Sequence, residues 1–303
     1  MPINILSKGS LFPEQLTNEM FNMVRGKSSL AKLSGAAPIP FNGEKVFTFN
    51  FDKEADLVAE NGAKSNGGVT ITPVTITPVK LEYGMRVSDE FVYAAEETQI
   101  QYLQAFAEGF ARKVARALDI MAFHGVNPRT GSSADSIASK SFDSIVTNVV
   151  NYDSSAPQDN VTAAIALVES AEHEVTGMAM APAFKSALAN LKKGSSSYEP
   201  MFPELGWGAT VGNLNGLPVD SNSTVSFNSN ADKAIVGNFA DFFRWGFAKE
   251  IPIEVIQYGN PDNDADAGDL KGHNQVYIRG EAYLGWGILT KDAFAIVKSG
   301  VSG

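Results

Sequence analysis

The sequence contains no cysteine and only three histidines, His124, His173 and His273. The absence of cysteine excludes disulfide bridges, thiolate zinc sites and cysteine nucleophiles. No apolar run approaches the roughly 20 residues of a membrane-spanning helix, and the opening residues MPINILSKGS lack the basic and then apolar pattern of an export signal. We therefore expect no membrane association and little scope for imidazole or metal-thiolate chemistry.

Positive charge is also scarce, because 24 lysines and arginines stand against 34 aspartates and glutamates. The net charge of −10 argues against a protein whose whole surface binds nucleic acid, although it permits one basic inner face. The length of 303 residues and the hydrophobic content of 44% suit one large or two modest globular domains with a buried core.

Residues 69–87 carry the most informative pattern. They read VTITPVTITPVKLEYGMRV, in which VTITP occurs twice and a regular alternation of apolar residues follows. Alternation predicts a strand with one buried face, but Pro73 and Pro78 lack the N–H group that a central strand donates. The stretch is therefore expected to be a long, bent strand at the edge of a sheet or outside it.

The repeat also predicts which side chains share a face. Because its length is odd, Val69 and Ile71 are expected on one face and Val74 and Ile76 on the other. A ribbon that changes its buried face in this way does not suit one compact core. We therefore expect these four residues to contact a neighbouring molecule.

A second strand is predicted just before this stretch, with Phe47, Phe49 and Phe51 on one face. Residues 52–68, between the two strands, are rich in charge and glycine and are longer than a tight turn requires. Residues 38–87 are therefore predicted to form a long two-stranded hairpin with a polar tip. Such a ribbon is marginally stable alone, so another surface must cover it.

Two amphipathic helices are predicted. Residues 13–25 form a short one, and apolar residues from Ile100 to Met121 recur at three- and four-residue steps in a longer one that Gly125 can end. About 25 residues at roughly 1.5 Å each give a rod of about 40 Å.

Three basic residues, Arg112, Lys113 and Arg116, cluster on the later part of the long helix. They form either an ordinary solvated face that complements the helix dipole or an inner face turned toward packaged nucleic acid.

The rest of the chain alternates short elements. Residues 145–243 have the composition of a separate α/β domain, and three stronger strands follow. The last two, in NQVYIRGEAYLGWGI and DAFAIVK, are predicted to pair antiparallel and to close the chain onto the long helix.

The loop NPDNDADAGDLKGH contains the metal candidate. Asp262, Asp264 and Asp266 match the alternating carboxylates of a calcium-binding EF-hand loop. However, Gly268 comes one place late, and His273 stands where a bidentate glutamate belongs. The alternative is a solvated surface loop without metal.

No pattern predicts catalysis or a cofactor. The glycine-rich residues 206–212 lack phosphate-loop spacing. Ser29 and Lys32 form an S-x-x-K pair without its partner motifs. We therefore expect a protein that is not an enzyme.

The order of these parts resembles the major capsid proteins of tailed bacteriophages, whose Hong Kong 97-type fold is shared with encapsulins. The resemblance runs over nearly the whole chain, and the order of its motifs carries it. The hairpin tip has Ala55, Val58, Glu60 and Gly62, with Asn61 between the usual glutamate and glycine. Four further stretches are similar to family motifs: VKLEYGMRVSDEF, LNGLPVDSN, VGNF with Asn238 in place of an acid, and the ending IRGEAYLGWGILTKDAFAIVK.

The resemblance implies an α+β fold of the Hong Kong 97 type. Its parts would be an N-terminal arm (1–37), an extended β-hairpin called the E-loop (38–87), a peripheral domain with the long spine helix (88–144), an inserted axial α/β domain (145–243) and return strands of the peripheral domain (244–303).

It also implies self-assembly as pentamers and hexamers into an icosahedral phage head around double-stranded DNA, within the host bacterial cytoplasm. Partners would be other copies of the chain, a portal, a possible decoration protein and packaged DNA. Because the arm starts at Met1, where many family members carry a scaffolding segment, a separate scaffolding protein or none is expected. The predicted contacts between copies are Val58, Glu60, Gly62, Val69, Ile71, Val74 and Ile76.

Two alternatives stay open. An encapsulin-like nanocompartment would enclose enzymes instead of a genome. A hydrolase or binding protein on an α/β domain would be a monomer or small oligomer with a pocket.

Overall fold

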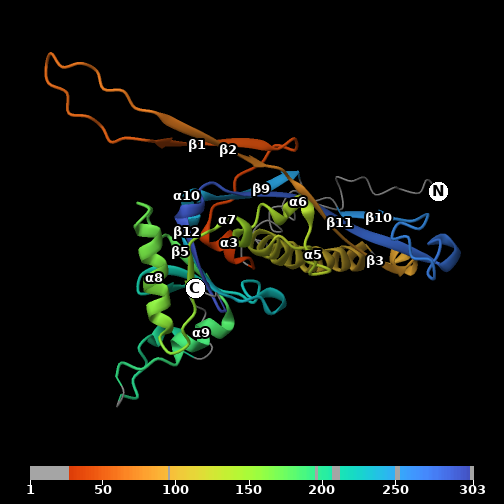
Figure 1. Cartoon of the computed structure of the whole chain (residues 1–303). Helices are drawn as coiled ribbons and strands as arrows, with labels where there is room; N and C mark the ends of the chain where they lie inside the picture. Colours follow the sequence, from red (N-terminus) through yellow and green to blue (C-terminus); the bar gives the residue numbers. More distant parts are fainter. Residues whose placement is uncertain (1–26, 95, 195–196, 207–211, 250–252, 301–303) are drawn as a thin grey trace.

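The computed structural model describes residues 27–300 except 95, 195–196, 207–211 and 250–252, so the helix predicted at 13–25 lies outside the described residues. The described chain forms a two-stranded ribbon, a four-stranded sheet and a six-stranded sheet, with helices packed on the two sheets (Figure 1). The helices are α3 (Ser29–Leu33), α4 (Glu90–Tyr93), α5 (Glu96–His124), α6 (Asp135–Ala138), α7 (Phe142–Ile145), α8 (Pro157–Glu169), α9 (Pro182–Ala189) and α10 (Phe239–Phe242). The strands are β1 (Glu44–Phe51), β2 (Val69–Ile76), β3 (Val79–Ser88), β4 (Val149–Asn151), β5 (Gly177–Met180), β6 (Asn213–Leu214), β7 (Leu217–Ser221), β8 (Asp232–Gly237), β9 (Phe243–Lys249), β10 (Ile253–Ile256), β11 (Gln275–Ile288) and β12 (Phe294–Lys298).

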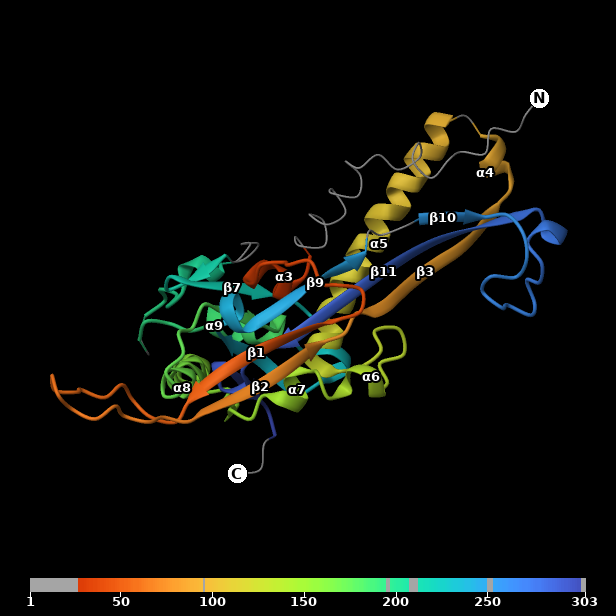
Figure 2. The ribbon, with the colours of Figure 1, turned by 90° about the horizontal axis from the view of Figure 1, so that it is seen from above.

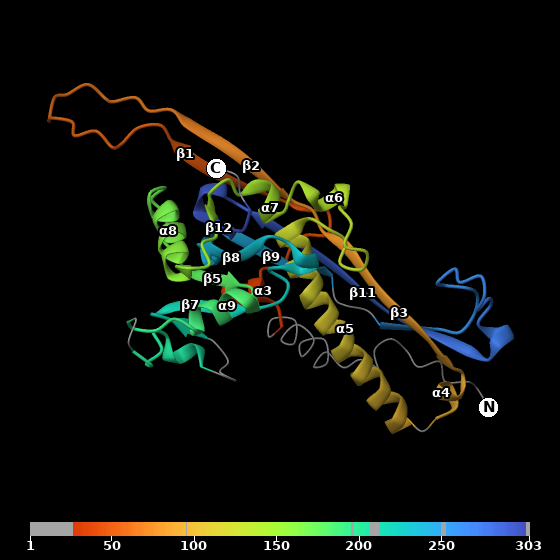
Figure 3. The ribbon, with the colours of Figure 1, turned by 60° about the horizontal axis from the view of Figure 1, so that its bottom comes forward.

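The predicted long helix is α5, which has 29 residues and lies along the four-stranded sheet (Figure 3). Its apolar stripe, which includes Leu103, Phe106 and Phe110, is buried. Gly280 of β11 lets the helix approach closely, because a methyl group there would lie 2.9 Å from the Phe110 ring. Gly125, with a φ of 64°, follows the last helical residue as predicted.

The final two strands do not pair with each other, so that prediction was wrong. β11 pairs with β3, β9 and β10, whereas β12 lies between β4 and β8 in the six-stranded sheet. The four residues 294–297 are all buried, and a strand that is apolar on both faces requires an interior place in a covered sheet. A 3₁₀ turn at Lys291–Ala293 separates the two strands. The last strand therefore joins the six-stranded sheet, whose other strands come from residues 149–237, and the division of the chain into domains stays a prediction.

The projecting ribbon is shorter than the predicted hairpin. β1 pairs with β2 from Glu44↔Ile76 to Phe51↔Val69, and the ribbon extends away from the body (Figures 1 and 2). β3 instead pairs with β11 over ten residue pairs. Pro78 lies at the break between β2 and β3, where its missing N–H group costs no ladder hydrogen bond.

The root of the ribbon is fixed to the chain's own β11. Ile76 is fully buried, and methyl groups at Gly287 and Gly285 would lie 2.7 Å and 3.2 Å from its side chain. Val74 lies beside it, 3.5 Å from the same position of Gly287. The expectation that Ile76 contacts a neighbouring molecule is therefore corrected, because the two glycines leave room for this side chain within the subunit.

This burial predicts that Ile76 stabilises the folded subunit itself. Ile76→Ala should lower the free energy of unfolding by about 2–4 kcal/mol, because it leaves a cavity beside β11. Chemical denaturation measures this loss. Ile71→Ala, on the exposed face of the same strand, should change it by less than about 0.5 kcal/mol; equal losses in both variants would contradict the assignment.

Candidate functional site

One face of the ribbon is apolar and exposed. In an antiparallel ribbon, directly opposed residues point to the same face, and the register opposes Phe47 to Pro73, Phe49 to Ile71 and Phe51 to Val69. We call these six residues the apolar ribbon face. The exposed fractions of its three phenylalanines, Val69 and Ile71 run from 49% to 79%. The predicted grouping of the phenylalanines is confirmed.

The opposite face of the ribbon is polar toward the tip. It carries Thr48, Thr70 and Thr72 there, and Val74 and Ile76 at the root. The predicted separation of Val69 and Ile71 from the latter two is thus confirmed. Away from its root, the ribbon leaves aromatic and aliphatic side chains in water, and a monomeric protein rarely exposes so continuous an apolar surface.

The hairpin tip is exposed throughout residues 52–68. Gly62 donates its N–H group to the Ala59 carbonyl in a turn, and a methyl group on Gly62 would lie 2.8 Å from the Val58 side chain. A larger residue at position 62 would therefore have to displace the Val58 side chain. The assignment of Val58, Glu60 and Gly62 as contacts between copies stays a prediction.

The basic residues of α5 differ in their surroundings. Arg112 and Lys113 are exposed. Arg116 is half-buried, donates to the Ser223 hydroxyl at 2.9 Å and lies over the Phe227 ring at 5.8 Å. The free basic surface is thus smaller than predicted and consists of the first two residues.

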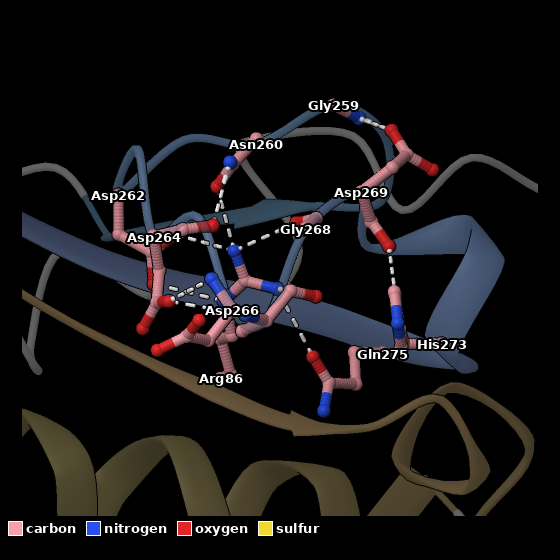
Figure 4. Close-up of polar contacts among 11 residues, drawn as sticks. Arg86, Gly259, Asn260, Asp262, Asp264, Asp266, Gly268, Asp269, His273 and Gln275 are labelled. Atoms are coloured by element: carbon pink, nitrogen blue, oxygen red, sulfur yellow. Dashed lines mark hydrogen bonds and ion pairs between the residues drawn. The ribbon is translucent and has the colours of Figure 1, made fainter.

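The loop that suggested calcium encloses a guanidinium group (Figure 4). Arg86 of β3 donates two hydrogen bonds to the Asp262 carboxylate. Its remaining acceptors are the Asn260 and Gln275 side chains and the carbonyl groups of Ala267 and Gly268. The hydrogen bonds to Arg86 hold the pKa of Asp262 down at about 2.

These contacts do not support the calcium interpretation. Asp262 and the nearby carbonyl groups, the oxygens that calcium would require, already accept from Arg86. Asp264 accepts instead from the backbone N–H groups of Asp266 and Ala267. Arg86 thus acts as the loop's own cation.

A buried carboxylate anchors the N-terminal part of the described chain to the spine helix. Asp119 of α5 is fully buried, and burial raises its pKa to about 6 although its hydrogen bonds lower it. It accepts hydrogen bonds from the Ser28 hydroxyl, the Ser29 and Leu30 backbone N–H groups, the Thr224 hydroxyl and the Asn222 side chain.

The S-x-x-K pair belongs to the same anchor. The Ser29 hydroxyl and the Lys32 ammonium group both bond to the Asp220 carboxylate of β7. Ser29 is fully buried, so a substrate cannot reach its hydroxyl. The pair therefore joins α3 to the six-stranded sheet.

A second buried polar cluster lies at the last residue of α5. The His124 Nδ1 atom lies 2.8 Å from Asp143 and 3.6 Å from Asp232. The Lys298 ammonium group lies 3.1 Å from Asp232 and 3.3 Å from Asp143. We call these four residues the junction cluster, because they come from α5, α7, β8 and β12.

The junction cluster has donors of a kind that bind zinc, but its arrangement does not fit a metal ion. The Lys298 ammonium group already contacts both carboxylates. The Asn230 side-chain nitrogen lies 2.9 Å from His124 Nδ1 and 3.0 Å from the Asp143 carboxylate. Nitrogen-bound hydrogens thus occupy the positions a cation would need.

Sequence reasoning did not find Asp119, Arg86 or the junction cluster. One signal was available for Asp119, since a lone acid in the apolar run ALDIMAF must be exposed or internally bonded. The partners of Arg86 and His124 lie up to 189 and 108 residues away, and no local pattern connects them.

Comparison with known proteins adds a family and a fold. The Phage capsid family matches residues 8–299. A solved chain from Mycobacterium phage Ogopogo is 31% identical, with a TM-score of 0.75 over 90% of this chain and 92% of its own. One from Gordonia phage Cozz is 21% identical, with a TM-score of 0.70 over 91% and 87%. The capsid of an empty GTA particle is 15% identical, with a TM-score of 0.61 over 90% of each chain. No curated protein matches.

Within the described residues, no helix is long and apolar enough to cross a membrane.

The Arg86 contacts predict a loop that depends on one side chain. Arg86→Lys keeps the charge, but an ammonium group cannot reproduce the several N–H donors of the planar guanidinium group. Hydrogen exchange should accelerate across residues 259–274 and not in β8. Lys271→Met, an exposed change in the same loop, should have little effect; unchanged exchange in the Arg86 variant would contradict this role.

The Asp119 contacts predict a strong effect of a nearly isosteric change. Asp119→Asn places an amide group where five donors converge, so the free energy of unfolding should fall by on the order of 3 kcal/mol. Chemical denaturation gives the value. Asp56→Asn in the exposed tip serves as the control, and a loss no larger than in that variant would refute the anchoring role.

Proposed function

Because the chain belongs to the phage capsid family and is a structural major capsid protein of a phage head with the Hong Kong 97-type fold, we propose that its copies assemble through the apolar ribbon face. Each ribbon would lie on an adjacent copy, in pentamers and hexamers of an icosahedral shell. The proposal includes no catalytic step.

The observation that carries this proposal is the exposed face of Phe47, Phe49, Phe51, Val69 and Ile71. A two-stranded ribbon is marginally stable alone, and covering this face would remove the apolar surface from water. The ribbon's donor surface and its receiving surface differ, so the contact is head-to-tail. Repetition of such a contact closes a ring when the rotation fits.

The same arrangement is compatible with packaged DNA. Arg112 and Lys113 are the exposed basic pair on α5, and we assign them to the inner surface. Two positive charges on a chain of net charge −10 would contact phosphates without a strong grip. The family resemblance extends the proposal to a scaffolding protein, a portal and a decoration protein as partners, and to assembly in the host cytoplasm.

A paired charge substitution tests the assembly surface. Phe49→Asp with Ile71→Asp should leave the subunit folded and abolish shells, because two carboxylates would be buried at each contact. Size-exclusion chromatography and negative-stain microscopy measure assembly, and circular dichroism measures folding. Nucleic acid inside wild-type shells would separate a phage head from a compartment that encloses enzymes.

The control places the same charges on the other face. Thr70→Asp with Thr72→Asp should still assemble, because these side chains point away from the proposed contact. Normal shells from the Phe49 and Ile71 variant would contradict the proposal, and so would a loss of shells in both variants.

A further inference from the structure

We propose that the junction cluster of His124, Asp143, Asp232 and Lys298 is a proton-dependent clasp that fixes the end of the spine helix to the six-stranded sheet and loosens as the pH rises above neutral. This inference is independent of the assembly surface, since the cluster lies inside a single subunit. It concerns a joint between the two sheets.

The cluster lies where the end of α5 meets the six-stranded sheet, so it can hold the two together. His124 is the last residue of α5, which packs on the four-stranded sheet, whereas Asp232 and Lys298 belong to adjacent strands of the six-stranded sheet. Asp143 lies on α7 between them. A change in the charge of His124 therefore acts where the two layers meet.

Charge balance makes the cluster sensitive to one proton. With both carboxylates ionised, two carboxylates and one ammonium group leave a net charge of −1, and one added proton, on His124 or on Asp232, brings the sum to zero. Asp232 is fully buried, and among the described residues its carboxylate oxygens accept no well-aligned hydrogen bond, although the Lys298 ammonium group lies 3.1 Å from one of them. A buried charge without full compensation is costly, so the protonated cluster is the more stable one.

The second ring nitrogen determines where the proton must bind. His124 Nε2 lies 2.9 Å from the Thr224 carbonyl oxygen, so it carries a hydrogen and donates. Nδ1, which faces both carboxylates, is then the atom that gains or loses a proton. When it is protonated it donates to Asp143. When it is not, its lone pair faces the carboxylates, and among the described residues the Asn230 amide, 2.9 Å away, is the one donor to it.

The pKa values shift in the direction that this geometry requires. Burial lowers the pKa of His124, but Asp143, the Thr224 carbonyl and Asp232 together raise it above its ordinary value. Burial and Asp143 raise the pKa of Asp232 to about 7, against the opposing effect of Lys298. The pKa of Asp143 is lowered, because its bonds to His124 and Asp232 and the charges of His124 and Lys298 outweigh its burial. His124 lies at the C-terminal end of α5, where the helix dipole also favours a cationic histidine.

The sign of the pH dependence follows from the raised values. A folded state that holds a proton more tightly than the unfolded chain loses stability as the pH rises through the folded pKa. The stability that protonated His124 contributes is lost as the pH rises above the ordinary pKa of histidine toward the raised pKa of the folded state. The stability that protonated Asp232 contributes is lost as the pH rises from the ordinary pKa of aspartate to about 7. For one proton the opening equilibrium should increase by at most about tenfold per pH unit.

Hydrogen exchange of the full-length protein tests the clasp. Protection factors, corrected for intrinsic exchange, are measured at pH 6.0, 7.0 and 8.5 for peptides that contain residues 119–124 and 294–298. In the wild type they should fall as the pH rises. His124→Gln should give low protection at every pH, because the position cannot gain a proton.

Asp232→Asn should act in the opposite direction. Its amide is a permanent donor where the Asp232 carboxyl can donate only when it is protonated, and the variant leaves one carboxylate with one ammonium group, so protection should stay high at pH 8.5. His273→Gln, in the exposed loop before β11, should keep the wild-type profile. A merely structural cluster would instead lose protection in both cluster variants and keep the wild-type slope.

The outcomes decide the proposal. Flat protection in the wild type between pH 6.0 and 8.5 would overturn it, as would an unchanged slope in Asp232→Asn. If His124→Gln does not fold, the wild-type slope and the Asp232→Asn profile give the answer without it.

Discussion

Close approach at the glycines of β11 is the constraint on which the rest of the structure depends. This strand pairs with β3, β9 and β10, while Gly280 admits the Phe110 ring of the spine helix and Gly285 and Gly287 admit Ile76 at the ribbon root. A side chain at any of these positions would separate layers that other contacts hold together. The positions of the spine helix and the ribbon are therefore set by glycines of β11, which carry no side chain.

Much of the architecture could be predicted from the sequence because its signals are local. The step pattern from Ile100 to Met121 identified the long helix, and the spacing of Phe47, Phe49 and Phe51 identified their shared face. Partner choice could not be predicted. Nothing within DAFAIVK shows that Phe294–Lys298 enters a different sheet from β11, because pairing depends on residues far along the chain. The apolar ribbon face was partly predicted. The burial of Ile76 within its own subunit could not be predicted, because it depends on Gly285 and Gly287 opposite it.

The buried polar groups lie at joints between elements. Asp119 connects α3 and α5 with the loop after β7, and the junction cluster connects α5 with the six-stranded sheet. Arg86 connects β3 with the loop before β11. Apolar contacts tolerate some sliding, but hydrogen-bonded charges tolerate little, because a displaced partner leaves a costly bare charge. These groups therefore fix the relative positions of layers that apolar packing only holds together.

The burial of Ile76 has a geometrical consequence for a shell. The first residues of the ribbon cannot swing without withdrawing that side chain from between Gly285, Gly287 and Ile39. In a shell whose rings contain five or six copies, neighbours meet at different angles. The flexing that accommodates both angles must then occur beyond the root, in the stretch that no other described residue of the same subunit covers, so each copy would present a rigid base and a compliant outer half.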